Sequence, residues 1–235
     1  MLMPQKLKVD LHTHTAEDPY ENINYTAFQL IDRASQEGFD ALAITNHNTV
    51  TYNKELIRHA EKKGIVLIPG MEATFSRKHI LIINPGFKKS PLNRPLDDLV
   101  KIKNDKNLII APHPFFPTSK SLKSKLFSYI EYFDAIEFSF YYNHFVNCNK
   151  KAVSAANQYK IPLVGTSDCH NLWLYGTSYT LVEAEKELFS IIEAIKKGEI
   201  EARADPLSLF TMCRVAMNFF LFHRHKVSYK IQSHS

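Results

Sequence analysis

Short apolar runs along this chain are each followed, within a few residues, by a histidine or an acidic residue. The clearest runs cover residues 7–11, 41–45, 65–69, 108–111 and 163–166. The polar residues that follow them are His12, His14, His47, Glu72, His113, Asp168 and His170. If the runs are strands of one parallel sheet, these side chains meet at its carboxyl edge, where barrel enzymes carry their active sites. Imidazoles and carboxylates gathered in this way are typical of a site for several divalent metal ions.

The composition is that of a folded chain in a reducing compartment. Its 235 residues are 45% hydrophobic and 23% charged, which is enough for one domain with a sizeable core. The net charge of +5 comes mostly from single lysines, which favours a solvated surface over a strongly basic binding face. Three unevenly spaced cysteines, Cys148, Cys169 and Cys213, argue against a disulfide framework, and the first residues contain no apolar signal segment. We therefore expect a cytoplasmic protein.

Strand and helix patterns alternate over most of the chain. Strands are expected at residues 8–11, 41–45, 65–69, 80–83, 108–111, 135–138 and 163–166, and helices at 25–37, 52–63, 96–103, 121–132, 145–159 and 185–197. Gly38 and Gly64 stand where a helix commonly ends in a left-handed residue. Strands separated by helices pair in parallel through right-handed crossovers. We therefore predict an α/β fold over residues 1–205, a TIM-like (β/α)7 barrel that is closed or nearly closed, rather than an open sheet with its site at one switch point.

An apolar segment at residues 207–222, followed by a polar tail without acidic residues, completes the chain. With about 16 residues, this segment is shorter than the roughly 20 that a membrane span needs. Asp205 is expected to cap a helix that has Pro206 in its first turn. The apolar residues at helical spacing are Leu207, Phe210, Met217, Phe220 and Leu221. We expect residues 206–235 to pack on, or extend from, the barrel domain; a dimer contact and a membrane-surface contact are the alternatives.

Two pairs of polar residues have the spacing of metal ligands on a strand. His12 and His14, in the segment DLHTHT, are two residues apart at a strand end, so a period of two places both on one face. Asp168 and His170 repeat this spacing in TSDCH with mixed oxygen and nitrogen donors. Cys169 then points the other way and is expected to be a small buried residue.

The remaining candidates are single residues. His47, Glu72, His79 and His113 each lie at the end of a predicted strand or next to one, where one histidine is commonly an ordinary core or capping group. Their joint occurrence changes this interpretation, because six of the eleven histidines occupy such positions. The other five lie on predicted helices or in the tail, where exposure to solvent explains them. The set as a whole therefore predicts a metal site.

The ordered segments DLHTHT, ITNHN, PGMEA, the His79 strand, APHP, AIEF and GTSDCH together resemble the PHP family of metal-dependent phosphoesterases, named for polymerase and histidinol phosphatase. The resemblance extends from about Lys8 to Arg203. It implies a distorted seven-stranded (β/α) barrel, which agrees with the number of strands expected above. It also implies two or three bound divalent ions, for which a mixture of imidazole and carboxylate ligands suits Zn, Mn or Fe.

The resemblance further implies which residues hold each ion. His12, His14, Glu72 and Asp168 would hold the first ion, and Glu72 would bridge to a second ion held by His79 and His113. A third ion would be held by His47, His170 and an acidic residue of the loop after His14. Family members commonly have this acid in a context such as SDG, whereas the loop here reads TAEDPYEN. Asp18 is the expected ligand, with Glu17 as the substitute.

The activity that the resemblance implies is hydrolysis of phosphate esters, either phosphomonoesters or nucleotides and other phosphodiesters. A metal-bound water can have a pKa near 7, and paired ions can hold both the attacking and the leaving oxygen, so a hydroxide that bridges two ions is the expected nucleophile. The expected catalytic residues are Glu72, Asp168 and His170, and Asp168 or a histidine would transfer the proton.

Other polar residues have less certain roles in this hypothesis. Arg77, Lys78 and Arg203 are candidates for binding phosphate oxygens, and arginine is suited to bidentate contact. Asp10 is a candidate for orienting one of the imidazoles, because metal-bound histidines usually donate their second N–H to an acceptor. Glu137 also lies at a strand end, either as a functional group or as an ordinary buried polar contact.

Two other functions remain open at this stage. An amidohydrolase uses a similar barrel, but it commonly needs a bridging lysine on a middle strand, and no lysine of this chain has that context. A non-catalytic PHP module, as found inside larger polymerases, would commonly have lost ligands. The expected partner is a small phosphorylated substrate or a nucleotide, without a stable nucleic-acid partner, because basic patches with interleaved aromatic residues are weak. The sequence indicates neither the exact substrate nor the oligomeric state.

Overall fold

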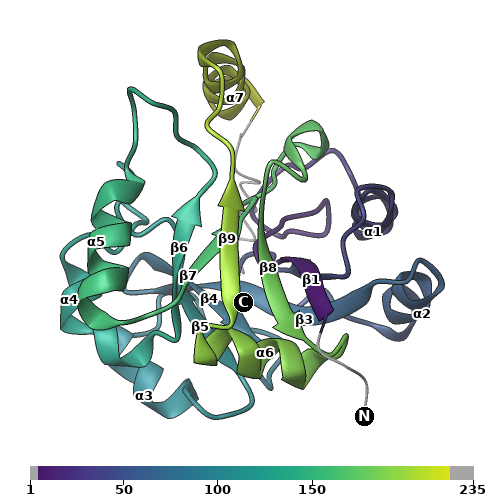
Figure 1. Ribbon diagram of the computed structural model, residues 1–235, viewed down its shortest axis with the longest axis horizontal. Coiled ribbons are helices and arrows are strands. Elements are labelled where there is room, and N and C mark those ends of the chain that lie inside the picture. Colours follow the sequence, from purple (N-terminus) through teal and green to yellow (C-terminus); the bar gives the residue numbers. More distant parts are fainter. Residues whose placement is uncertain (1–4, 223–235) are drawn as a thin grey trace, which may run out of the picture.

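The fold is built around one sheet that curls into a nearly closed barrel (Figure 1). The computed structural model describes the backbone of residues 5–222 and the side chains of residues 5–218. In this range the strands are β1 Gln5–Asp10, β2 Ala41–Ile44, β3 Val66–Phe75, β4 Lys78–Ile83, β5 Leu108–Ala111, β6 Ala135–Ser139, β7 Leu163–Thr166, β8 Ser178–Ala184 and β9 Ile200–Ala204. Their order across the sheet is β7-β6-β5-β4-β3-β2-β1-β8-β9. Because β7 contacts β8 and β9, the two ends of the sheet come together (Figure 1).

Most of the described strands run in one direction. β1, β2 and β3 pair in parallel, and so do β5, β6 and β7. By contrast, β4 is antiparallel to β3 and β5, and β8 is antiparallel to β1 and β9. All strands except β4 and β8 therefore have their carboxyl ends at the same edge of the barrel, which we call the site edge. This architecture confirms the predicted α/β fold, a distorted barrel of the TIM-like type.

The sequence analysis predicted a strand at residues 80–83 but not the antiparallel direction of β4, and it did not predict the strands β8 and β9. β4 follows β3 through the two-residue turn of Ser76 and Arg77, whose φ angles are 45° and 64°. Such turns usually contain asparagine or glycine, so this one has no sequence signal. The neighbouring loop holds the turn in place, because Ser76 N–H donates to the Arg94 carbonyl and Arg77 N–H donates to Asn93 Oδ1, both at 2.6 Å. β8 and β9 also pair in antiparallel fashion, and β8 pairs with β1. The chain passes from β8 to β9 through the helix α6 Leu188–Lys197.

The described helices lie around the barrel, except the last one, which lies beyond one end of it (Figure 1). They are α1 Ala27–Gln36, α2 Lys54–Lys62, α3 Leu99–Ile102, α4 Lys125–Ser128, α5 Asn149–Tyr159, α6 Leu188–Lys197 and α7 Leu209–Phe222, with 3₁₀ turns at Leu96–Asp98, Ile130–Tyr132 and Leu172–Leu174. α1 begins with a capping box in which Thr26 and Gln29 satisfy each other's backbone N–H groups. Gly38 and Gly64 have φ angles of 70° and 72°, so both predicted helix ends are confirmed.

The period of two along each strand determines which side chains face the barrel interior. In β4, Leu81 joins the interior core, whereas Ile80 packs against the outer helices. His79 lies on the same face as Leu81 and therefore points into the mouth of the barrel. In the same way, Glu72 of β3 and Glu137 of β6 are buried on the interior faces of their strands. The apolar interior thus ends in a layer of polar side chains at the site edge.

The C-terminal helix begins later than predicted. Asp205 and Pro206 precede α7 instead of forming its first turn, and Ser208 caps the helix, because Thr211 N–H donates to Ser208 Oγ at 3.1 Å. The reason is that Leu207 is buried and its N–H donates to the Tyr142 carbonyl at 2.8 Å, which holds the chain outside the helix up to this point. Within residues 5–222, no helix is long and apolar enough to cross a membrane.

The apolar residues predicted to form one packed stripe on α7 do not all pack on the barrel. Of the predicted residues, Leu207 is buried, whereas Phe210 and Met217 are exposed; Met212, which was not among them, is buried as well. Phe220 and Leu221 lie outside the described side chains.

Candidate metal centre

The structure brings all nine predicted metal ligands together at the site edge. They are His12, His14 and Asp18 after β1, His47 after β2, Glu72 on β3, His79 on β4, His113 after β5, and Asp168 and His170 after β7. Most are buried, whereas His113, Asp168 and His170 are partly exposed. Four overlapping groups of three residues have donor atoms within 4.8 Å of one another. The metal-site geometry predicted from strand ends is therefore present in the fold.

Glu72 lies at the centre of this cluster and is only 2% exposed. Its Oε2 atom lies 3.4 Å from His14 Nε2, 3.7 Å from His12 Nε2 and 3.0 Å from His47 Nε2. Its Oε1 atom lies 2.7 Å from His79 Nδ1 and 3.2 Å from His113 Nε2. The two carboxylate oxygens thus face two different groups of imidazoles. This is the arrangement that a carboxylate bridging two cations requires.

One group of four donor atoms has separations that suit a single bound ion. His12 Nε2, His14 Nε2, Glu72 Oε2 and Asp168 Oδ1 lie 3.2 to 3.7 Å apart in five pairings. In a tetrahedral site with ligands about 2.0–2.2 Å from the ion, neighbouring donor atoms are separated by roughly 3.3–3.6 Å. Burial of two imidazoles and two carboxylates so close together also calls for a cation to compensate their charge and satisfy their lone pairs. The residues present therefore fit a bound divalent ion.

Glu137 orients the His12 ring. The Glu137 carboxylate is fully buried and lies 3.1 Å from His12 Nδ1, which leaves Nε2 of the same ring for the cluster. It also accepts hydrogen bonds from Thr166 Oγ1 and from the His113 backbone N–H. Sequence analysis proposed Asp10 for this type of role, but Asp10 Oδ1 instead accepts the backbone N–H groups of His12 and Ser167. Two roles were left open for Glu137, a functional group or an ordinary buried polar contact, and its contact with His12 supports the functional role.

The acidic residues of the loop after His14 have three different positions. Asp18 is buried, and its Oδ2 lies 2.8 Å from His47 Nδ1 and 3.3 Å from His14 Nδ1. Glu17, the predicted substitute, lies outside the cluster, because both its oxygens accept the N–H of Ala27 at the start of α1. Asp18 is thus the one of the two predicted acids that reaches the cluster.

Glu21 is a cluster residue that the sequence analysis missed. Its Oε2 lies 2.7 Å from His170 Nε2, while His170 Nδ1 donates to the Asp168 carbonyl at 2.8 Å. A histidine fixed in this way through one nitrogen presents the other nitrogen to a ligand. The loop has no periodic pattern, so only its acidic residues as a group could have signalled this position. Glu21 therefore belongs with His170 among the residues that could hold a third ion.

Two residues of the cluster have strained backbone conformations. Asp168 has a φ angle of 43° and His113 a φ angle of 29°, both in the left-handed region that non-glycine residues rarely adopt. Such conformations cost of order 1–3 kcal/mol each and persist where the surroundings impose them, commonly at functional sites. In these conformations Asp168 Oδ1 lies 3.3 Å and 3.5 Å from the Nε2 atoms of His12 and His14, and His113 Nε2 lies 3.2 Å from Glu72 Oε1.

The pKa values of the cluster reflect mutual pairing of imidazoles and carboxylates. Burial lowers the pKa of His12, but the charges of Asp168, Glu137 and Glu72 outweigh it and raise this pKa well above its usual value. Burial raises the pKa of Glu72, but the surrounding imidazoles, with His79 first, hold it well below its usual range. For His47 the same opposition, burial against Glu72 and Asp18, raises the pKa to about 9. Without a metal ion, the raised pKa values of His12 and His47 keep these imidazoles protonated, and a bound cation would replace those protons.

The His47 shift predicts a pH-dependent effect of metal on stability. In metal-free protein, protonated His47 contributes stability that is fully present below pH 6.5 and is lost as the pH rises through about 9. A divalent cation competes with this proton and binds more tightly at higher pH. The gain in Tm on adding metal to chelator-treated protein should therefore be larger near pH 9 than near pH 6.5. Thermal unfolding followed by circular dichroism measures this gain, and an equal gain at both pH values would contradict the prediction.

Glu137→Gln is expected to weaken metal binding by about 10- to 100-fold, the usual loss when a residue that orients a metal-bound histidine is changed. The amide keeps the size of the side chain but removes the negative charge beside His12 Nδ1. Competition with a chromophoric chelator measures the affinity. The control is Glu183→Gln, at an exposed glutamate of β8, which should leave the affinity unchanged. Equal affinities of the two variants would show that Glu137 does not act on the metal site.

The three residues predicted to bind phosphate oxygens lie outside the cluster. Arg77 is exposed at the tip of the β3–β4 turn, and no described acidic residue forms an ion pair with it. Lys78 points away from the barrel interior, and its Nζ donates to the Ser119 carbonyl at 2.7 Å. Burial, together with the charges of Lys123 and Lys125 as well as Arg77, lowers the pKa of Lys78, so this flank of the site is basic. Arg203 is half exposed on β9 and pairs with Glu201.

Comparison with known proteins decides the family. Residues 10–147, more than half of the chain, match the PHP domain family. The chain belongs to this family. Residues 147–200 match the family described as PHP-associated. The resemblance seen in the ordered sequence segments is thereby confirmed, and the chain is a metal-dependent phosphoesterase-like protein of the PHP type.

Individual relatives agree with this assignment but do not identify a substrate. An uncharacterized protein of Methanocaldococcus jannaschii is 28% identical over 131 residues, which are 52% of this chain and 75% of the relative. Among solved structures, a two-domain protein from Bacteroides vulgatus containing a predicted PHP-like metal-dependent phosphoesterase is similar with a TM-score of 0.65 and 21% identity, over 90% of this chain and 69% of that one. The lesion-specific endonuclease PfuEndoQ from Pyrococcus furiosus is similar with a TM-score of 0.62 and 16% identity, over 90% and 66%. At these identities, the structural similarity shows a shared fold.

Proposed function

We propose that this chain hydrolyses phosphate esters with two or three divalent ions, Zn, Mn or Fe, held at the site edge. The observation that carries the proposal is the position of Glu72, whose two oxygens face two separate groups of imidazoles. Ions held there would lower the pKa of a bound water to about 7 and offset the negative charge of the phosphoryl oxygens. The first ion would be held by His12, His14, Glu72 and Asp168. The second would be held by Glu72, His79 and His113, and the third by His47, His170 and an acid of the loop, Asp18 or Glu21.

The partly exposed members of the cluster are suited to act on the substrate. The side chains of Asp168 and His170 are 22% and 20% exposed, whereas those of His12 and His14 are inaccessible. A group that transfers a proton must reach the reacting oxygen, which only the accessible side chains can do. We assign to Asp168 and His170 the removal of a proton from the attacking water and the donation of a proton to the leaving oxygen. Glu72 holds the ions.

The basic flank supports recognition of a phosphate group next to the site. Arg77 is presented on a strained turn without an acidic partner among the described residues, which suits bidentate binding of phosphate oxygens. Lys78 keeps the adjacent loop in place through Ser119 and adds its charge to the same flank. Arg203 remains a weaker candidate, because Glu201 already occupies its guanidinium. A substrate with more than one phosphate, such as a nucleotide, would use this flank.

The amidohydrolase alternative is not favoured. The residue in the bridging position is a glutamate, Glu72, where that class commonly has a lysine. As the sequence predicted, the proposed substrate is a small phosphorylated molecule rather than a stably bound nucleic acid. The similarity of the fold to an endonuclease keeps nucleic acid among the substrates to be tested.

Metal-loaded protein should be tested on a phosphomonoester, a phosphodiester, an oligonucleotide, an amide and a lactone, with metal content measured in parallel. Hydrolysis of a phosphate ester that needs metal and is lost in Asp168→Asn would support the proposal. Protein that retains its metal but hydrolyses none of the phosphate esters would refute it. Activity on the amide or lactone alone would favour the amidohydrolase alternative.

A further inference from the structure

One face of α7 is apolar, and no part of the chain that the structure describes covers it. Leu209, Phe210 and Met217 are 61%, 78% and 58% exposed, and Cys213 between them is exposed as well. At about 100° per residue, these four positions span only about 100° of the helix circumference. Three large apolar side chains on one exposed helix face are unusual in a protein of this size unless something covers them.

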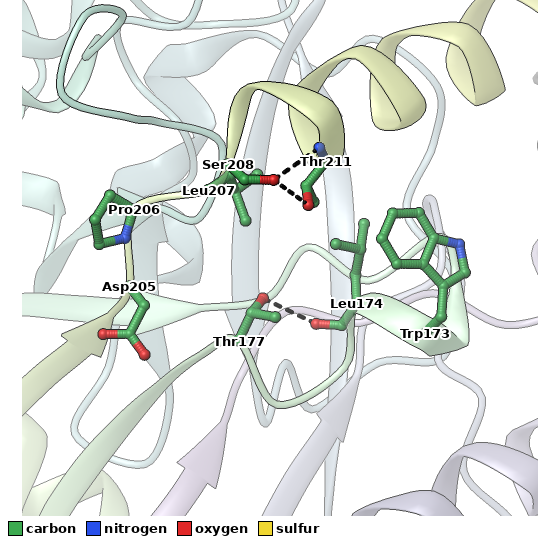
Figure 2. A pocket seen from close by; sticks show the side chains of 8 residues that line it. All are labelled: Trp173, Leu174, Thr177, Asp205, Pro206, Leu207, Ser208 and Thr211. Atoms are coloured by element: carbon green, nitrogen blue, oxygen red, sulfur yellow. Dashed lines mark hydrogen bonds between the residues drawn. The ribbon is translucent and has the colours of Figure 1, made fainter.

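The helix is held so that this face points away from the barrel. Figure 2 shows Ser208 capping the first turn and Leu207 directed toward the loop that carries Leu174. Leu207, Leu174, Phe140 and Met212 form a small buried cluster, and Tyr141 Oη donates to the Met212 carbonyl at 3.3 Å. Because the opposite face of α7 is used for this attachment, the exposed residues cannot fold back onto the same cluster.

A second element presents an apolar side chain at the same end of the molecule. Phe145 is 84% exposed in the loop between β6 and α5, which rises beside α7 in Figure 1. This loop is ordered, because the buried Asn143 Oδ1 accepts the N–H groups of Phe145 at 2.9 Å and Val146 at 2.7 Å. Val146 is itself 49% exposed. The turn therefore holds two apolar side chains out into solvent.

Trp173 and Arg214 add an amphipathic pair next to this face. The Arg214 guanidinium carbon lies 4.0 Å from the centre of the Trp173 ring, and Trp173 is 36% exposed. Tryptophan and arginine side chains have both an apolar and a polar part, so they are favoured at a boundary between apolar and aqueous surroundings. Trp173 also lines a hollow of about 350 Å³, together with Leu174, Pro206 and Thr211 (Figure 2).

The charge of this segment indicates what covers the apolar face. Residues 206–235 contain Arg214, Arg224, Lys226 and Lys230 and no aspartate or glutamate, so they carry +4 of the net +5 of the chain. A second copy of α7 would bring another Arg214 and no carboxylate to pair with it. An anionic lipid surface supplies both an apolar layer for Leu209, Phe210 and Met217 and negative charge for the basic residues.

We propose that the exposed face of α7, the Phe145 turn and Trp173 form a surface that binds the interface of an anionic membrane. The helix would lie in the headgroup region without spanning the bilayer. β9 runs parallel to β1, so α7 begins at the site edge, and this attachment turns the metal centre toward the lipid headgroups. The attachment does not depend on the proposed hydrolysis.

Vesicle flotation of the full chain tests this proposal. Binding is expected to vesicles of phosphatidylcholine with phosphatidylserine, to fall at high salt, and to be weak on phosphatidylcholine alone. The double variant Phe210→Ser/Met217→Ser should bind more than about tenfold more weakly, because two large apolar side chains no longer insert. Phe145→Ser should also weaken binding. Phe189→Ser is the matched control, since Phe189 is 50% exposed on α6, which joins β8 and β9 at the opposite edge, and should bind as the original chain does.

Two results would overturn the proposal. The first is that the original chain does not bind anionic vesicles; if the double variant then abolished a dimer seen by light scattering, or binding to duplex DNA, this face would bind that partner instead. The second is that the α7 and Phe145 variants, with unchanged Tm and metal content, bind vesicles as tightly as Phe189→Ser.

Discussion

Glu72→Gln is expected to remove metal from both groups of imidazoles and to lower phosphate-ester hydrolysis by roughly 1,000-fold. Ions that polarise a phosphoryl oxygen are worth several kcal/mol, and each 1.4 kcal/mol is a factor of ten in rate. The carboxylate of Glu72 faces His14 and His47 through one oxygen and His79 and His113 through the other. The glutamine amide carries no negative charge, so the single substitution removes a charged ligand from both groups of imidazoles. No other residue of the cluster has this double position.

Elemental analysis and steady-state hydrolysis measure the two parts of this prediction. Glutamine has nearly the volume of glutamate, so circular dichroism should show an unchanged fold at low temperature. Glu183→Gln, on an exposed side chain, controls for the loss of one negative charge and should keep both metal and activity. If Glu72→Gln retained its full metal content, the bridging role would be wrong even if activity fell.

Most of the cluster could be predicted from the sequence because its members follow a simple geometric rule, whereas Asp18 was expected only from the resemblance to the PHP family. Side chains at the carboxyl ends of parallel strands meet at one edge, and a period of two along a strand gives neighbouring ligands the same face. His79 obeys the same period of two although its strand runs in the opposite direction. It lies at the start of an antiparallel strand, yet its parity with Leu81 turns it into the same mouth. The predicted ligand positions therefore did not depend on the direction of every strand.

The residues that the sequence did not identify depend on contacts without a local pattern. Glu21 reaches His170 because Asp18 Oδ1 accepts the N–H groups of Tyr20 and Glu21 and folds the loop into a compact turn. Glu137 was named from the sequence with its role left open, because its partner His12 lies 125 positions away. The β3–β4 turn of Ser76 and Arg77 carries neither the glycine nor the asparagine that usually marks such turns, and β8 and β9 pair across the intervening helix α6. Long-range pairing of this kind is fixed only when the barrel closes.

The exposed face of α7 shows a second feature that could not be predicted from the sequence, namely what an apolar helix face packs against. Helical spacing predicted an apolar stripe, but a stripe does not specify its partner. Leu207 and Met212 bind the barrel, and the exposed residues lie on another face of the same helix. Periodicity identifies an amphipathic helix, whereas the choice between core, second copy and membrane needs the fold and the distribution of charge.

Gly165→Ala is expected to lower stability by about 3 kcal/mol or more, the upper part of the usual range for overpacking. A Cβ atom at Gly165 would lie 2.6 Å from the Tyr179 carbonyl oxygen, and 3.0 Å and 3.2 Å from the backbone oxygen and nitrogen of Arg203. All three contacts are backbone atoms of β8 and β9, so no side chain can move aside. The Gly165 carbonyl also accepts the hydroxyl of Thr180 at 2.8 Å. A side chain here would push β7 away from the strands that complete the barrel.

The expected fall in Tm is roughly 6–12 °C for a chain of this length. Gly198→Ala is the matched control, since its Cβ atom would approach only Pro162 Cγ, at 3.8 Å, and its cost comes mainly from a φ angle of 77°. Gly165→Ala should also weaken metal binding, because β7 leads directly into Asp168, whereas Gly198→Ala should leave it unchanged. The Tm and the metal affinity together distinguish the two effects. If Gly165→Ala were no less stable than Gly198→Ala, the close approach of β7 to β8 and β9 would not be what completes the barrel.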